Sequence, residues 1–225
     1  MNKKNLVATT LFAGIILAFG GLAAYSHNMD LSQTKNTVTQ TLPTRNNDNV
    51  ITSDNTIVLR VLANHAVYTS VEELESNADL IVVGKTIKDF DRNKPFIRKN
   101  PKSRGGRGIA EFYTITPFEV KKVLKGSGNG TGISLIQPAV LIDQSNKQEK
   151  RLLILDDYTL LKKNSSYLLY LAKTDGGMYG VLGVSQGKFN LDKTDKEEEE
   201  FEAKDEQYKE LKAKVLEKNK AELNQ

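Results

Sequence analysis

The chain has 225 residues, 39% hydrophobic and 27% charged, which is an ordinary balance for a soluble domain with one core. Its net charge of +4 permits attraction to anionic polymers or lipid head groups without requiring it. Because there is no Cys, disulfides, thiolate metal sites and a lipid-bearing Cys are excluded, and the two His residues, His27 and His65, give poor support to a catalytic triad or a histidine metal site. We therefore expect no cofactor and no metal.

The first 26 residues predict a membrane-directed segment. Two Lys in MNKKN precede an apolar run of 19 residues, 6–24, close to the roughly 20 that a spanning helix needs. Ala24 and Ser26 also have the spacing of a signal-peptidase site, with cleavage after Ser26. A retained membrane anchor and a cleaved secretory signal both stay open. The basic flank places the rest of the chain outside the membrane in either case.

Residues 27–55 are rich in Ser, Thr, Asn, Gln and Asp and predict a flexible linker, because such a segment buries too little apolar surface to offset its ordering entropy. A β-rich domain is predicted over 56–192. Its first strand is expected at 56–63, and a short helix follows, for which Thr69 or Ser70 provides the N-cap. The run DLIVVGKTI then starts with consecutive apolar residues, as in a strand buried on both faces.

Further strands are predicted by EFYTITPFEVKKVLKG, GISLIQPAVLI, RLLILDD, SYLLYLAK and the segment up to Asp192. The first of these changes the phase of its apolar face, which indicates a β-bulge, and Pro117 indicates an edge or a bend. Asp175 and Gly176 predict a two-residue hairpin turn. The fold class is therefore mainly β, with strands spaced as in a sandwich or small barrel.

Two motifs that suggest chemistry are better explained as structure. The glycines of GSGNGTG precede a strand, whereas a dinucleotide-binding loop needs a helix there, so a hairpin connection is expected. The carboxylates of Asp143, Asp156 and Asp157 lie at strand ends. Adjacent residues of a strand face opposite ways, so we interpret them as solvated turn acids and not as a catalytic pair.

The most charged part of the predicted domain is the segment FDRNKPFIRKNPKSRGGRG. One interpretation is a solvated, mobile hairpin loop; the other is a contact surface for phosphates or carboxylates, because clustered cations gain by displacing counterions from a polyanion. Phe90 and Phe96 are the aromatic residues nearby that stacking would require. The candidate ligand-binding residues are Arg92, Lys94, Phe96, Arg98, Lys99, Lys102, Arg104 and Arg107.

Residues 193–225 predict one long charged helix with Thr194 as N-cap. Acidic residues fill its first turns and Lys its last, as the helix dipole favours. Phe201, Tyr208, Leu211 and Val215 form a thin apolar stripe that packs either on the β-domain or on a partner helix.

Three segments carry a family resemblance: NADLIVVGKTI, YTITPFEVKKVLKG and YLLYLAK. They are similar to exported bacterial β-barrel domains of uncharacterised role and, more distantly, to the netrin-like module of tissue inhibitors of metalloproteinases. The matched positions are Asn77, Ala78, Asp79, Lys125, Gly126, Tyr167 and Leu168. The resemblance implies a five-stranded barrel of the oligonucleotide/oligosaccharide-binding (OB) type. Those inhibitors chelate a metal through an amino-terminal Cys, which this chain lacks, so inhibition is not implied.

Two functions are compatible with the sequence. The first is a non-enzymatic binding module at the bacterial cell surface, held by residues 6–24 or secreted, that contacts an extracellular protein or envelope component. The second is binding of an anionic polymer through the basic 92–107 segment, with a cell-wall polymer a better candidate than nucleic acid. An enzyme is disfavoured by the scarcity of His and the absence of Cys.

Overall fold

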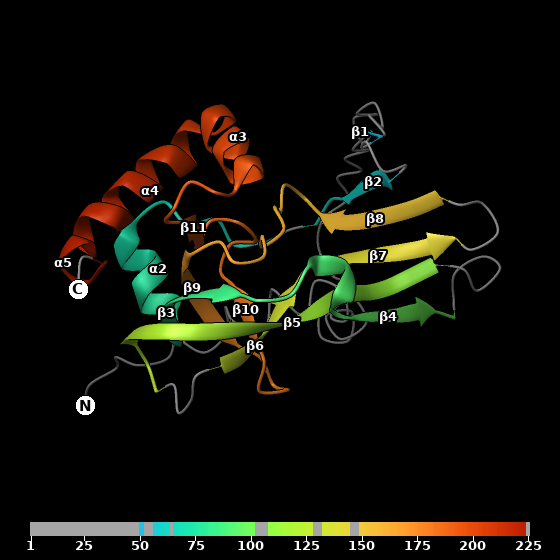
Figure 1. Ribbon diagram of the computed structural model, residues 1–225, viewed down its shortest axis with the longest axis horizontal. Helices are drawn as coiled ribbons and strands as arrows, with labels where there is room; N and C mark the ends of the chain where they lie inside the picture. The colour runs from blue at the N-terminus through green and yellow to red at the C-terminus, as the bar shows by residue number, and fades with distance from the viewer. Residues whose placement is uncertain are drawn as a thin grey trace, which may run out of the picture.

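A closed ring of five strands forms the centre of the computed structural model, which describes residues 50–51, 56–63, 65–101, 108–127, 132–144 and 149–223 (Figure 1). The ring strands are β3 (Leu80–Thr86), β5 (Gly108–Lys125), β6 (Gly132–Gln137), β9 (Tyr167–Lys173) and β10 (Tyr179–Val181). The ring closes because β10 pairs in parallel with β6 and antiparallel with β9. The predicted mainly-β class and barrel are confirmed.

The ring strands β3 and β9 are buried on both faces, as the apolar run of β3 predicts. Strand β9 shows this most clearly. Tyr167, Leu169 and Leu171 of β9 pack in one core cluster, whereas the alternate residues Leu168 and Tyr170 pack in another, against the helices. All the side chains from Tyr167 to Ala172 are buried. Because both faces need apolar residues, the strand reads as a continuous hydrophobic run.

The long strand β5 changes partners along its length. Its first part, up to Ile115, pairs with β4 (Lys94–Asn100), and its last part, from Phe118 on, pairs with β3. Pro117, which has no N–H to donate, lies between these two pairings. Two register shifts interrupt the β3–β5 pairing, so the predicted bulge is confirmed.

A second sheet of four strands lies beside the barrel. Its order is β1 (Val50–Ile51), β2 (Thr56–Val61), β8 (Glu149–Leu155) and β7 (Ala139–Gln144). Pro138 separates β6 from β7, so one apolar stretch of sequence supplies a barrel strand and then a strand of this sheet. The segment 56–192 therefore contains a sheet in addition to the barrel.

One predicted turn and one predicted solvated acid differ in the structure. The hairpin between β9 and β10 is present, but residues 174–178 connect the strands, which is longer than the two-residue turn predicted from Asp175 and Gly176.

Asp156 is not a solvated acid: its side chain is only 13% exposed, and its carboxylate lies 3.1 Å from His65 Nδ1. Asp157 is exposed, as predicted. The side chain of Asp143 lies outside the described residues.

The short helix α2 (Val71–Asn77) begins where the sequence predicts. Ser70 Oγ accepts a hydrogen bond from the backbone N–H of Glu73, and the Glu73 carboxylate accepts one from the backbone N–H of Thr69. These two bonds satisfy one donor left free at the helix start, that of Glu73, and the N–H of the residue before the cap. The bonds from Thr69 hold the pKa of Glu73 below its ordinary value.

The C-terminal segment is not one helix, which corrects the prediction. It forms α3 (Lys196–Lys204), α4 (Glu206–Lys218) and α5 (Lys220–Leu223). Asp195, and not Thr194, caps α3, and Asp205 ends α3 and caps α4 by accepting from Tyr208 N–H. The predicted apolar stripe packs on the protein's own barrel, since Tyr208, Leu211 and Val215 share a core cluster with Tyr170 and other strand residues.

A buried group of charged side chains joins these helices to the barrel. Lys188, from β11 (Lys188–Asn190), is fully buried, with its Nζ 3.1 Å from the carboxylate of Asp195 and 2.5 Å from the hydroxyl of Thr159. The buried carboxylate of Glu198 accepts from the backbone N–H of Asn190 and from Lys212 Nζ at 2.9 Å. We call Lys188, Asp195, Glu198 and Lys212 the buried ion cluster.

Aromatic hydroxyls complete this junction. Tyr167 donates to Asp195 at 2.9 Å, and Tyr208 donates to the backbone carbonyl of Lys188 at 2.6 Å. Burial raises the pKa of both phenols, with nearby carboxylates adding to the effect, so both remain neutral donors at physiological pH. The junction thus pairs its buried charges and uses its hydroxyls as donors, as buried polar groups require.

The predicted membrane-directed segment 1–26 lies outside the described residues, as do residues 27–49 and 52–55 of the predicted linker. Val50 and Ile51, which fall within the predicted linker, form β1 and pair with β2. None of the helices in the described part of the chain has the length and apolar character needed to cross a membrane.

Candidate functional site: the outer face of the β4–β5 arm

The basic segment predicted as a loop is largely a strand, which corrects that interpretation. Lys94–Asn100 form β4, which pairs antiparallel with the first part of β5, and a 3-10 turn, η3 (Phe90–Arg92), precedes it. This two-stranded arm extends toward the end of the molecule opposite the C-terminal helices (Figure 1). All β4 side chains from Lys94 to Lys99 are exposed.

One face of the arm carries alternate residues of β4 and their partners on β5. Phe96 lies opposite Tyr113 and its ring stacks on the tyrosine ring, with centroids 4.5 Å apart and an interplanar angle of 14°. Arg98 lies opposite Glu111, and Arg98 Nε is 2.9 Å from its carboxylate. We call Lys94, Phe96, Arg98, Glu111 and Tyr113 the outer face.

The other side of the arm packs against the second sheet. Phe112 is buried in a cluster with Val140 of β7 and Leu153 of β8. Thr114 donates its hydroxyl hydrogen to the backbone carbonyl of Ala139 at 2.7 Å. These contacts fix the arm in position, so the outer face is presented on an anchored element.

The charges of the outer face are only partly neutralised. Arg98 forms an ion pair with Glu111, whereas Lys94 forms no ion pair with any other described residue. Lys99, on the other side of β4, is likewise without an ion pair in the described part of the chain. Burial, followed by the Glu111 charge, raises the pKa of the Tyr113 phenol. The face can therefore offer cations, a hydroxyl donor and an aromatic edge to a ligand.

The structure brings some of the predicted site residues together and separates others. Lys94, Phe96 and Arg98 share the outer face, and Lys99 lies on the same strand. Arg92 lies in η3, with its Nε 4.0 Å from the carboxylate of Asp89. Lys102, Arg104 and Arg107 lie outside the described residues.

Sequence reasoning missed Tyr113 and Glu111. Both belong to a strand that was predicted, but their role depends on lying opposite Phe96 and Arg98, which only the pairing register reveals. The sequence KPFIRKN gave little signal, because its apolar residues Pro95, Phe96 and Ile97 are consecutive and do not alternate with polar ones.

The described residues contain no group of three or more His, Asp or Glu side chains arranged to hold a metal ion. The chain matches no model of a known protein family, and no curated protein sequence or solved structure matches it significantly. A five-stranded ring alone gives no support to the netrin-like resemblance, which therefore stays a prediction.

Proposed function

We propose that this protein is a non-enzymatic binding module displayed outside the bacterial membrane, anchored by residues 6–24 or secreted after cleavage at Ser26. Its partner is an extracellular protein or an envelope component, and the outer face is the contact surface. The observation that carries the proposal is the stacked Phe96–Tyr113 pair on an anchored arm, in which Phe96 is exposed beside cationic side chains and Tyr113 is half-buried. Aromatic and Arg residues are the types enriched at interface hot spots.

The topology supports the same surface. Numbered along the chain, the ring strands follow the order 1-2-3-5-4, with the third and fifth parallel, which supports an OB-type interpretation of the barrel. In OB-type barrels the connection between the first and second strands commonly contacts the ligand. Here that connection runs from β3 to β5 and contains η3 and β4. The basic residues thus occupy the connection that such barrels use for binding.

The test uses the intact chain as immobilised bait against an envelope extract. The outer-face variant Lys94→Gln/Phe96→Ala should lose the partner that the wild type retains. The matched control is Lys121→Gln/Val123→Ala, which alters an exposed Lys and a Val of 37% exposure on β5, beyond the arm. Phe96 has the same 37% exposure. If both variants retain the partner like the wild type, the outer face is not the contact surface.

A second candidate, binding of an anionic cell-wall polymer, is favoured by Lys94 and Lys99, which have no ion-pair partner among the described residues. Poly(glycerol phosphate) is a suitable probe. Its affinity should fall steeply with rising salt, because cation–phosphate contacts release counterions. Lys94→Gln/Lys99→Gln should weaken binding and reduce the salt slope. Binding that is constant from low to high salt would eliminate this candidate.

A further inference from the structure

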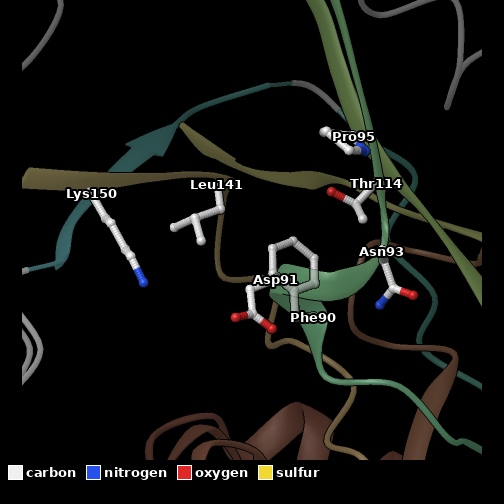
Figure 2. Close-up of a pocket in the computed structure, with 7 residues that line it drawn as sticks. All are labelled: Phe90, Asp91, Asn93, Pro95, Thr114, Leu141 and Lys150. Carbon is white, nitrogen blue, oxygen red and sulfur yellow. The ribbon is translucent and has the colours of Figure 1, made fainter. Parts of the chain in front are cut away.

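A cleft lies on the side of the arm opposite the outer face, where η3 and the arm meet the second sheet (Figure 2). Its volume is about 270 Å³. It is lined by Phe90, Asp91, Asn93, Pro95, Thr114, Leu141 and Lys150. Small-molecule sites in proteins usually have about 300–1,000 Å³. The cleft therefore suits a compact ligand better than a polymer.

Two opposite charges line the cleft without neutralising each other. Asp91 comes from η3 and Lys150 from β8, and neither forms an ion pair with another described residue. Figure 2 shows Lys150 extending from its strand toward the side of the cleft where the Asp91 carboxylate lies. A bound molecule with one positive and one negative group would pair with both.

Asn93 is a largely buried part of the same lining. The residue is only 9% exposed, and its Nδ2 donates to the backbone carbonyl of Asp89 at 3.1 Å. Its Oδ1 is buried and has no hydrogen-bond partner among the residues that the structure describes. This oxygen points away from Asp91 and Lys150 (Figure 2), so Asn93 shapes the wall of the cleft and does not offer an acceptor to a ligand.

The remaining lining is apolar. Phe90, Leu141 and Pro95 contribute hydrocarbon surface to the cleft. Sites for small ligands typically combine such surface with a few polar groups that fix orientation. Asp91 disfavours a purely anionic ligand, and Lys150 disfavours a purely cationic one.

We propose that this cleft binds a zwitterion of the size of a free amino acid. The ligand's ammonium group pairs with the Asp91 carboxylate. Its carboxylate pairs with Lys150, and its apolar part packs against Phe90 and Leu141. This site is separate from the outer face, so it does not depend on the function proposed above.

The first test titrates the intact chain with leucine, alanine, leucinamide and N-acetyl-leucine in a calorimeter. Leucinamide lacks the carboxylate and N-acetyl-leucine lacks the ammonium. We expect leucine or alanine to bind saturably, and each blocked analogue to bind about tenfold or more weakly than leucine, because each loses a charge-assisted bond. Absence of saturable binding by both amino acids, or equal binding of the analogues, overturns the proposal.

The second test assigns each charge to its residue. Asp91→Asn should abolish the preference for leucine over N-acetyl-leucine, and Lys150→Met should abolish the preference for leucine over leucinamide. Asp175→Asn and Lys121→Met change exposed residues far from the cleft in the fold and should leave both preferences intact. If Asp91→Asn and Lys150→Met behave like these controls, the zwitterion does not bind in this cleft.

The outer-face variant Lys94→Gln/Phe96→Ala separates the two proposals. It should keep wild-type affinity for leucine while losing its envelope partner. Suppose that this variant loses leucine binding while its free energy of unfolding stays close to that of wild type. That result would place the zwitterion on the outer face and overturn the cleft assignment.

Discussion

Two regions of the molecule use charged residues in opposite ways. In the buried ion cluster, Lys188, Asp195 and Glu198 are essentially inaccessible to solvent, and every charge has a partner within the fold. On the arm, the basic side chains are exposed, and Lys94 and Lys99 have no partner among the described residues. Removing water from a charge is expensive unless the fold compensates it. The cluster's charges therefore serve folding, while those of the arm are available for contact.

The largest expected effect is that of Asp195→Ala. This change leaves the Lys188 ammonium buried without its closest carboxylate and removes the cap of α3. We expect a loss of about 3–5 kcal/mol in the free energy of unfolding, measured by urea denaturation. Asp205→Ala is the control, because it removes a helix cap that is not part of the cluster, and it should cost about 1 kcal/mol. Equal effects of the two variants would mean that the buried charge is not decisive.

A paired replacement sharpens this result. Lys188→Met/Asp195→Leu removes both charges, and buried ion pairs replaced by apolar residues often change stability little. The double variant should therefore be more stable than Asp195→Ala. A double variant less stable than Asp195→Ala would show that packing, and not charge pairing, dominates at this position.

Lys212→Met should have an intermediate effect that depends on pH. Burial disfavours the Lys212 charge, but the hydrogen bonds to Glu198 and Glu202 outweigh it and raise the pKa above its ordinary value of 10.5. The stabilisation is therefore fully present below pH 10.5 and is lost as pH rises through the folded-state pKa. At neutral pH the variant should lose about 2 kcal/mol. The gap to wild type should narrow in alkaline urea titrations, and a gap that widens would contradict the assigned pairing.

Tyr208→Phe removes one hydrogen bond from the junction without removing a charge. The lost bond is the 2.6 Å contact to the Lys188 carbonyl, and the ring can keep its packing on Phe189. We expect a cost of about 1 kcal/mol in urea unfolding. A cost as large as that of Asp195→Ala would show that the hydroxyl, rather than the ion pairs, holds the helices.

The smallest effect on stability is expected on the arm. Phe96→Ala removes the exposed stack with Tyr113, which should cost about 0.5–1.5 kcal/mol. Lys94→Gln should change the free energy of unfolding by less than about 0.5 kcal/mol, since surface charges without partners contribute little. Urea denaturation of each single variant measures both values. A loss above about 3 kcal/mol in either variant would mean that the arm is needed for folding.

The sequence predicts the barrel strands because their cause is local. The runs in β3 and β9 are continuous and apolar, and such runs follow from burial on both faces. The start of α2 was likewise predictable, because its N-cap Ser70 accepts from the backbone N–H of Glu73, only three residues along the chain. The closure of the ring was harder to predict from the sequence, because it depends on the pairing of β10 with both β6 and β9.

The predictions that failed did so where tertiary contacts decide. The basic segment was interpreted as a loop because of its high charge, and its pairing with β5 makes it a strand. The C-terminal segment has helical residues throughout, yet it breaks at Asp205, where a new cap begins. The buried ion cluster brings Lys188 together with Asp195, Glu198 and Lys212, which belong to the segment predicted as one long charged helix.

The most direct test measures folding and binding on the same two proteins, Lys94→Gln/Phe96→Ala and the barrel control Lys121→Gln/Val123→Ala. Each is unfolded in urea and then used as bait for the envelope extract. We predict that the outer-face variant stays within about 2 kcal/mol of wild type and loses its partner, while the control keeps it. An outer-face variant that binds like the control would contradict the proposal that the exposed charges and aromatic stack of the arm form a contact surface.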